Sequence, residues 1–159
     1  MLLRVISLIG LSLFLVGCGS ASSANPPPAN SGPVVISTDH LTYSPSDPIA
    51  VTVHNTLATP IYAMDTQSSC SLLSLQYQVN GVWQPSQVAQ CPQKRPARPV
   101  KIEAGATYTT TITAGYPGLK QDVFPAGSYR LVLSYTTAPS GIPTPGTDTP
   151  ATSATIQVQ

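Results

Sequence analysis

The sequence predicts an all-β fold, an antiparallel β-sandwich, on the strength of three observations. Apolar and polar residues alternate in short runs, turn residues separate these runs, and no helical period lasts for three turns. Charged residues make up 8% of the 159 residues, whereas helix-rich proteins draw heavily on Glu, Lys and Arg. A small closed barrel is the main structural alternative for such a set of short strands.

The expected strands follow from the local pattern in chain order. The clearest alternation begins at Ile49, Val51 and Val53, whose neighbours are polar or small, as in a half-buried strand. Leu73, Leu75 and Tyr77 repeat this pattern, and so do the apolar residues from Tyr129 onward. About seven to nine strands, as in a two-sheet sandwich, are expected from these runs. The apolar runs are 34–36, 41–43, 49–54, 61–64, 73–79, 82–83, 100–103, 108–113, 129–135 and 154–158.

A hairpin is predicted at Asn80-Gly81, between the runs 73–79 and 82–83. This dipeptide is the strongest short-range hairpin signal, because a type I′ turn requires positive φ at both central positions. Trp83, the single tryptophan, lies just after the turn. Since sandwich cores commonly bury a tryptophan, we expect Trp83 in the core, and an anchor residue for a binding partner is the alternative.

Short motifs in this region resemble bacterial immunoglobulin-like domains. Residues 51–56 read VTVHNT, which resembles the motif V-x-V-x-N-T of their second strand, and Phe124-Pro125-Ala126-Gly127-Ser128-Tyr129 resembles the start of their penultimate strand. The resemblance implies an immunoglobulin-like β-sandwich over residues 34–159 and a tyrosine corner at Tyr129. Together with Ile102-Glu103-Ala104-Gly105, the motifs also resemble the bacterial intracellular proteinase inhibitors, which share this fold. The export signal and the cysteine pair of this chain depart from that family.

The N-terminal segment has the features of an export signal. Arg4 precedes an apolar run from Val5 to Val16, which is shorter than the roughly 20 residues of a membrane-spanning helix. The run ends in Leu15-Val16-Gly17-Cys18, which resembles the lipobox of bacterial lipoproteins. The resemblance implies cleavage after residue 17 and attachment of membrane lipid to Cys18. An ordinary secretory signal and an uncleaved anchor are the alternatives.

Residues 18–33 are expected to form a lipidated cysteine followed by a flexible tether. After Cys18 the segment reads GSASSANPPPANSGP and contains no large apolar residue. Ser and Gly make such a chain flexible, and the three consecutive prolines stiffen its middle. The chain therefore divides into a signal peptide over 1–17, a tether over 18–33 and a folded domain over 34–159.

Cys70 and Cys91 remain as an even pair once Cys18 carries lipid. An exported chain with two such cysteines predicts a disulfide bond. The two residues lie equally far from the turn at Asn80-Gly81, so they face each other if the hairpin strands stay in register. A metal or redox site is the alternative, but the chain has no Cys-x-x-Cys motif and no His in this segment.

Composition and motifs argue against several functional classes. With 7 Lys or Arg against 6 Asp or Glu, the chain lacks the basic excess of a nucleic-acid-binding protein. No nucleophile elbow or phosphate-binding loop is present, and the carboxylates are scattered one per loop. We therefore predict no catalytic residues, no cofactor and no metal site. A copper site formed by His40, His54 and Met64 is the weak alternative.

Two segments stand out as candidate recognition loops. The first, defined here as the basic segment, contains Lys94, Arg95, Arg98 and Lys101, and prolines at 92, 96 and 99 are expected to keep it out of sheet pairing. It is a candidate contact for an anionic envelope polymer or a protein partner, and a merely solvated loop is the alternative. The second is a long Thr- and Pro-rich loop expected over residues 136–152.

These observations predict a lipid-anchored protein of the cell membrane or outer membrane, facing the extracytoplasmic side. Its monomeric domain is expected to act as a non-catalytic binding or adhesion module. A proteinase-inhibitor-like module and an accessory subunit of an envelope complex are the alternatives. The fold class alone decides none of these, because one fold serves unrelated functions.

Overall fold

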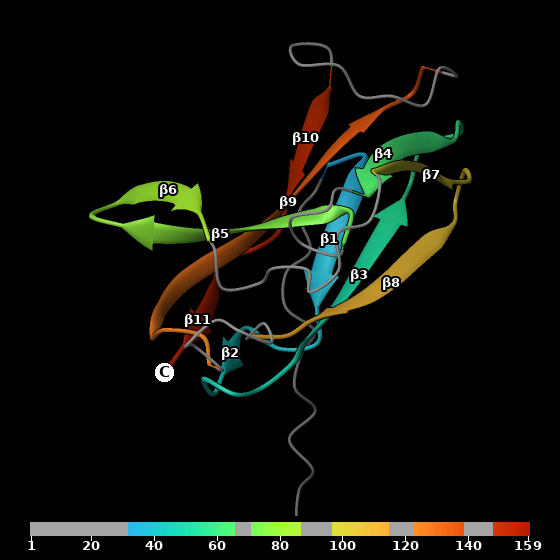
Figure 1. Ribbon diagram of the computed structural model, residues 1–159. Helices are drawn as coiled ribbons and strands as arrows, with labels where there is room; N and C mark the ends of the chain where they lie inside the picture. Colours follow the sequence, from blue (N-terminus) through green and yellow to red (C-terminus); the bar gives the residue numbers. More distant parts are fainter. Residues whose placement is uncertain (1–31, 66–70, 87–96, 115–122, 139–147) are drawn as a thin grey trace, which may run out of the picture.

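The computed structural model describes residues 32–65, 71–86, 97–114, 123–138 and 148–159 (Figure 1). These residues form eleven β-strands and no helix, so the predicted all-β sandwich is confirmed. The strands are β1 (Val34–Thr38), β2 (Thr42–Tyr43), β3 (Ile49–Asn55), β4 (Ile61–Asp65), β5 (Leu73–Val79), β6 (Val82–Pro85), β7 (Arg98–Ile102), β8 (Thr107–Ile112), β9 (Gly127–Thr136), β10 (Thr149–Thr152) and β11 (Ile156–Val158).

The strands form two sheets. The small sheet has the order β1-β3-β8, and the large sheet has the order β2-β11-β9-β4-β7, with β10 and β5 also paired to β9 and β6 paired to β5. Every pairing is antiparallel except that of β2 with β11. Strands β1, β3 and β8 therefore make one sheet, and the strands that pair around β9 make the other.

Strand β9 is the centre of the large sheet. Its first residues pair with β11 and its last with β10 on one side, while β5 and then β4 pair with it on the other. Its odd-numbered residues from Tyr129 to Tyr135 are buried, and its even-numbered residues face outward. This period of two results from the pleat of the strand. Burial of each Ile or Leu side chain stabilises the core by about 2 kcal/mol.

Two local predictions are confirmed. Asn80 and Gly81 have φ values of 50° and 81°, and they join β5 to β6 as the hairpin signal predicted. The Tyr129 hydroxyl donates a 2.7 Å hydrogen bond to the backbone oxygen of Pro125, four residues earlier, which is the bond of a tyrosine corner. Figure 1 shows the β5–β6 hairpin extending beyond the rest of the large sheet.

The expected loop over 136–152 is too long at both ends. Strand β9 continues to Thr136, and residues 149–152 form β10, in which Thr149 lies opposite Tyr135. Ser153 N donates to Leu131 O, so the alternation of an antiparallel pair directs the backbone of Pro150 away from β9. The proline therefore removes no donor from this ladder. Residues 139–147 lie outside the described part.

The expectation that Pro99 escapes sheet pairing is also wrong. Pro99 lies in β7 opposite Met64 of β4. Strand β7 is the last strand of its sheet in the described structure, and a proline is tolerated on such an edge because its other side faces no partner strand. Strands β6 and β10, which each pair with one described strand, likewise contain a proline, at Pro85 and Pro150.

Candidate binding surface

The outward face of β5, β6 and β9 brings together side chains that are distant in the sequence. Gln76 of β5 lies opposite Arg130 of β9, and Gln78 lies opposite Trp83 of β6. Because side chains alternate along a strand, all four belong to the face turned away from the core. We call this set of residues (Gln76, Gln78, Trp83 and Arg130) the hairpin face.

Arg130 is held in place by two of its neighbours on the hairpin face. Its Nε donates a 2.7 Å hydrogen bond to Gln76 Oε1, and its guanidinium carbon lies 4.6 Å from the centre of the Trp83 ring. A guanidinium stacked on an aromatic ring in this way is attracted by the ring quadrupole. The sequence analysis predicted Trp83 in the core, and this is wrong. Trp83 is half-buried, and its ring supports the Arg130 side chain.

Arg130 differs from the other described basic residues in having no acidic partner. Arg98 Nε lies 3.2 Å from Asp65 Oδ2, and Lys101 Nζ lies 2.7 Å from Glu103 Oε1. No carboxylate among the described residues lies within ion-pair distance of Arg130. A planar guanidinium has five donors, and the bond to Gln76 uses one of them. The remaining donors can bind an oxyanion.

The hairpin face rests on a layer of tyrosines beneath it. The rings of Tyr77 and Tyr129 lie 4.9 Å apart, and the Phe124 ring lies 5.9 Å from that of Tyr129. Burial raises the pKa of Tyr129 to about 12, so its hydroxyl stays protonated and donates to Pro125 at ordinary pH. These contacts hold β5 against β9 and therefore fix the spacing between Gln76 and Arg130.

The candidate basic segment is only partly described. Lys94 and Arg95 lie outside the described residues, as do Cys18, Cys70 and Cys91. Arg98 and Lys101 are exposed on β7, three positions apart, so their side chains leave opposite faces of the strand. The hydrogen bond to Glu103 raises the pKa of the Lys101 amine. Within the described structure these two residues do not form one basic patch, and a role for the basic segment stays a prediction.

The register of the hairpin bears on the predicted disulfide. Gln76 lies opposite Pro85 and Val79 opposite Val82. The described pairing ends there, because β5 begins at Leu73 and β6 ends at Pro85. Both cysteines lie outside the described residues, so the disulfide stays a prediction.

The two histidines are separately placed. His40 lies beside Tyr43, with ring centres 5.8 Å apart, and its Nε2 is 3.5 Å from Asp39 Oδ2. His54 Nε2 lies 3.3 Å from the backbone oxygen of Gly105. No group of three or more His, Cys, Asp or Glu residues that could hold a metal occurs in the described ranges.

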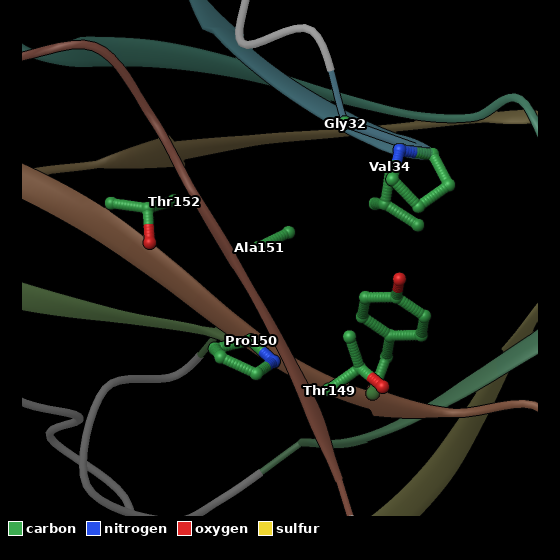
Figure 2. Close-up of a pocket in the computed structure, with 8 residues that line it drawn as sticks. Gly32, Val34, Thr149, Pro150, Ala151 and Thr152 are labelled. Atoms are coloured by element: carbon green, nitrogen blue, oxygen red, sulfur yellow. The ribbon is translucent and has the colours of Figure 1, made fainter.

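A second feature is a hollow of about 360 Å³ between the start of β1 and the strand β10 (Figure 2). Figure 2 shows Ala151 and Val34 on facing sides of this hollow. Tyr135 also lines it, and burial raises the pKa of its hydroxyl. No charged side chain is among the lining residues, which are Gly32, Pro33, Val34, Tyr135, Thr149, Pro150, Ala151 and Thr152. The hollow therefore offers apolar and hydroxyl contacts but no charge.

The hairpin face was not predicted from the sequence. Arg130 lies between two apolar residues of the predicted strand 129–135, and Trp83 lies opposite Gln78 if the hairpin turns at Asn80-Gly81. The period of two along a strand therefore could have assigned both residues to the outward face. Their proximity depends on the pairing of β5 with β9, which no local pattern specifies. Only the tertiary structure reveals it.

Comparisons with known proteins identify no relative: no protein-family model matches the sequence, and no curated protein matches it. In the part of the chain that the structure describes, no helix is long and apolar enough to span a membrane.

Proposed function

We propose that this protein is a lipid-anchored cell-envelope protein whose β-sandwich acts as a non-catalytic binding module. The lipobox-like sequence ending at Cys18 supports the anchor, and the polar segment that follows supports a tether. In this proposal the hairpin face contacts the ligand. The anchor keeps the domain at the extracytoplasmic surface, and the tether gives it room to reach an envelope component.

The observation that carries the proposal is the state of Arg130. It is an arginine oriented by Gln76 and Trp83, on an outward sheet face, with no carboxylate partner among the described residues. Ordering a long side chain costs conformational entropy. Because Gln76 and Trp83 already restrict the Arg130 side chain in the free protein, less entropy is lost when a ligand binds. Such a pre-oriented cation is suited to recognition.

A binding role also agrees with the use of the described carboxylates. Asp65 and Glu103 pair with basic residues, Asp39 accepts a hydrogen bond from the Tyr43 hydroxyl, and Asp47 accepts one from the backbone of Ser44. Each of these four groups has a structural partner, and Asp148 is the remaining described carboxylate.

The proteinase-inhibitor-like alternative has one specific observation in its favour. Val79 and Val82, on either side of the hairpin turn, are 36% and 60% exposed, and the hairpin extends from the body of the domain (Figure 1). An exposed apolar tip could enter a protease cleft or contact a partner subunit. A panel of proteases tests the inhibitor function directly, because binding to an envelope component predicts no inhibition.

The anchor and the binding face are tested separately. For the anchor, mass spectrometry should find a chain that begins at Cys18 and carries the added mass of lipid, and an unmodified Cys18 would contradict lipidation. For the face, detergent-solubilised lipidated protein is incubated with isolated envelope material and the bound fraction is measured. Trp83→Ala and Arg130→Gln should each reduce binding by about tenfold, the effect of losing one charge-assisted contact.

Two control variants show whether a loss of binding is specific to the hairpin face. Thr109→Ala changes an exposed residue of β8, on the other sheet, and should leave binding unchanged. Arg98→Gln removes one charge, as Arg130→Gln does, but at a residue that already pairs with Asp65. If Arg98→Gln lowers binding and Arg130→Gln does not, the basic segment is the contact surface and the hairpin face is not.

A further inference from the structure

We infer that Arg130 is a binding site for the carboxylate of an acidic glycan, and this inference rests on the proposed function of the hairpin face. The first step is the geometry of the guanidinium. Its Nε is engaged by Gln76 Oε1 at 2.7 Å, and stacking on Trp83 restricts the orientation of its plane. The Nη groups form the part of the fork that remains for a ligand. An arginine fork binds a planar carboxylate through two parallel hydrogen bonds.

No carboxylate of the described residues competes with a ligand for Arg130. Arg98 and Lys101 are neutralised by Asp65 and Glu103, whereas no described carboxylate lies within ion-pair distance of Arg130. The charge of Arg130 is therefore complementary to an acidic group supplied from outside. Because Arg130 is only half-buried, a ligand can reach the guanidinium without opening the sandwich.

The side chains around Arg130 on the hairpin face are uncharged and can form hydrogen bonds. Gln76 and Gln78 bring uncharged amide groups to the same face, and Gln78 Nε2 lies 3.4 Å from the backbone oxygen of Gly81, a long contact. Amide groups both donate and accept hydrogen bonds, as sugar hydroxyl groups do. One cation among neutral hydrogen-bonding groups suits a saccharide that carries a carboxylate.

The same environment disfavours a phosphate polymer. A protein that binds a polyphosphate backbone uses several Lys or Arg residues and gains affinity from releasing counterions at each of them. Arg130 is the single Lys or Arg in strands β5, β6 and β9, which form this surface. The site therefore suits a ligand with few charges and many hydroxyl groups.

The test uses the full lipidated protein in a neutral detergent and measures dissociation constants for four probes. The probes are polygalacturonate, its methyl ester, poly-L-glutamate and polyphosphate. We expect polygalacturonate to bind at least tenfold more tightly than its methyl ester, because esterification removes the carboxylate charge and leaves the sugar backbone. Arg130→Gln should abolish that difference, and Arg130→Lys should restore only part of it because an ammonium group has no fork.

Each other outcome overturns the inference. Equal binding of polygalacturonate and its methyl ester would exclude carboxylate recognition. Equal or tighter binding of poly-L-glutamate would replace the glycan with an acidic polypeptide, and tighter binding of polyphosphate would replace it with a phosphate polymer. Arg98→Gln is the matched control, and its affinity for polygalacturonate should equal that of the unmodified protein.

The inference and the proposed function fail in different ways. If Trp83→Ala and Arg130→Gln leave binding to envelope material unchanged, the hairpin face is not the binding surface and the proposed function fails. If both variants lose envelope binding but the protein does not distinguish polygalacturonate from its ester, the binding function stands and the carboxylate-glycan assignment fails.

Discussion

The ring of Tyr77 lies directly against the backbone of Gly127. A Cβ atom added at Gly127 would lie 2.5 Å from Tyr77 Cε2 and 2.9 Å from its hydroxyl oxygen, and Gly127 has a φ of +150°. The Tyr77 hydroxyl also donates a 3.3 Å hydrogen bond to the backbone oxygen of Ala126. A glycine is therefore required where β9 begins, because any side chain would displace the tyrosine that attaches the hairpin to the sheet.

Gly127→Ala should destabilise the fold by roughly 3 kcal/mol, from unfavourable backbone geometry and overpacking together. The free energy of unfolding in urea measures this loss. Gly105→Ala is the control: Gly105 also has positive φ, but nothing lies within 4 Å of its added Cβ, so only the backbone cost of about 1 kcal/mol applies. In a Tyr77→Ala background the cost of Gly127→Ala should fall, and an unchanged cost would contradict the proposed clash.

Asn55 joins two turns at one end of the sandwich. It is fully buried, and its Nδ2 donates to the backbone oxygens of Thr59, Ile102 and Glu103 at 3.0, 3.2 and 3.0 Å. Its Oδ1 accepts a 3.1 Å hydrogen bond from the backbone of Leu57. The side chain therefore satisfies backbone groups of the β3–β4 and β7–β8 connections.

Asn55→Ala should cost roughly 3 kcal/mol of unfolding free energy, because it removes the hydrogen bonds of a fully buried side chain, including the one to the buried backbone oxygen of Ile102. Denaturant titration followed by tryptophan fluorescence measures the change. Thr56→Ala, which removes an exposed hydroxyl bonded to Pro33 O, should cost less than about 1 kcal/mol. Equal effects of the two substitutions would show that the Asn55 network adds little.

Alkaline pH should weaken the fold through Tyr43 and Tyr129. Burial raises the pKa of each from 10.0 to about 12, and at Tyr43 the hydrogen bond to Asp39 adds to this effect. Between these two pKa values the unfolded chain loses protons that the folded chain keeps. The stability is therefore complete below about pH 10 and falls as the pH rises toward about 12.

This pH dependence is measured as the free energy of unfolding at a series of alkaline pH values. Tyr129→Phe and Tyr43→Phe should each reduce the slope above about pH 10, because each removes one titrating group. Tyr129→Phe should also lower stability at neutral pH by about 1 kcal/mol, through loss of the bond to Pro125. A slope unchanged in both variants would assign the alkaline transition to other groups.

The predicted Cys70–Cys91 disulfide should be detectable in protein isolated without a reducing agent. Mass spectrometry of a non-reduced digest should find the two cysteines in one cross-linked pair of peptides, and Cys70→Ser should free Cys91 for alkylation. The bond closes a loop around the Asn80-Gly81 hairpin, so its loss should cost about 3 kcal/mol in the chain-entropy treatment. Alkylation of both cysteines in the unmodified, unreduced protein would exclude the bond.

The sequence predicts those elements whose signal is local. The alternation of Ile49, Val51 and Val53 specifies the buried face of β3, and Asn80-Gly81 specifies the hairpin, because both depend only on adjacent residues. The tyrosine corner is equally local, since Tyr129 bonds a residue four positions earlier. These predictions agree with the structure.

Features that depend on pairing between distant strands are not predictable in this way. Gln76 and Arg130 are 54 positions apart, and their contact exists only because β5 lies beside β9. Strand β10 was missed because Thr149-Pro150 has the composition of a loop, and its pairing depends on which side of the strand the proline faces. Trp83 was predicted in the core because sandwich cores commonly bury a tryptophan, whereas it lies on the outward side of β6 beside Arg130.

The prolines of the edge strands have a consequence for how this protein behaves at high local concentration. An exposed sheet edge is a template for intermolecular pairing, and many proteins block it with lysine. Strands β6 and β10 contain no charged residue, whereas β7 carries Arg98 and Lys101. In all three strands a proline (Pro85, Pro99 or Pro150) interrupts the row of amide donors. A proline does this without net charge, so its effect on edge-to-edge pairing does not depend on ionic strength.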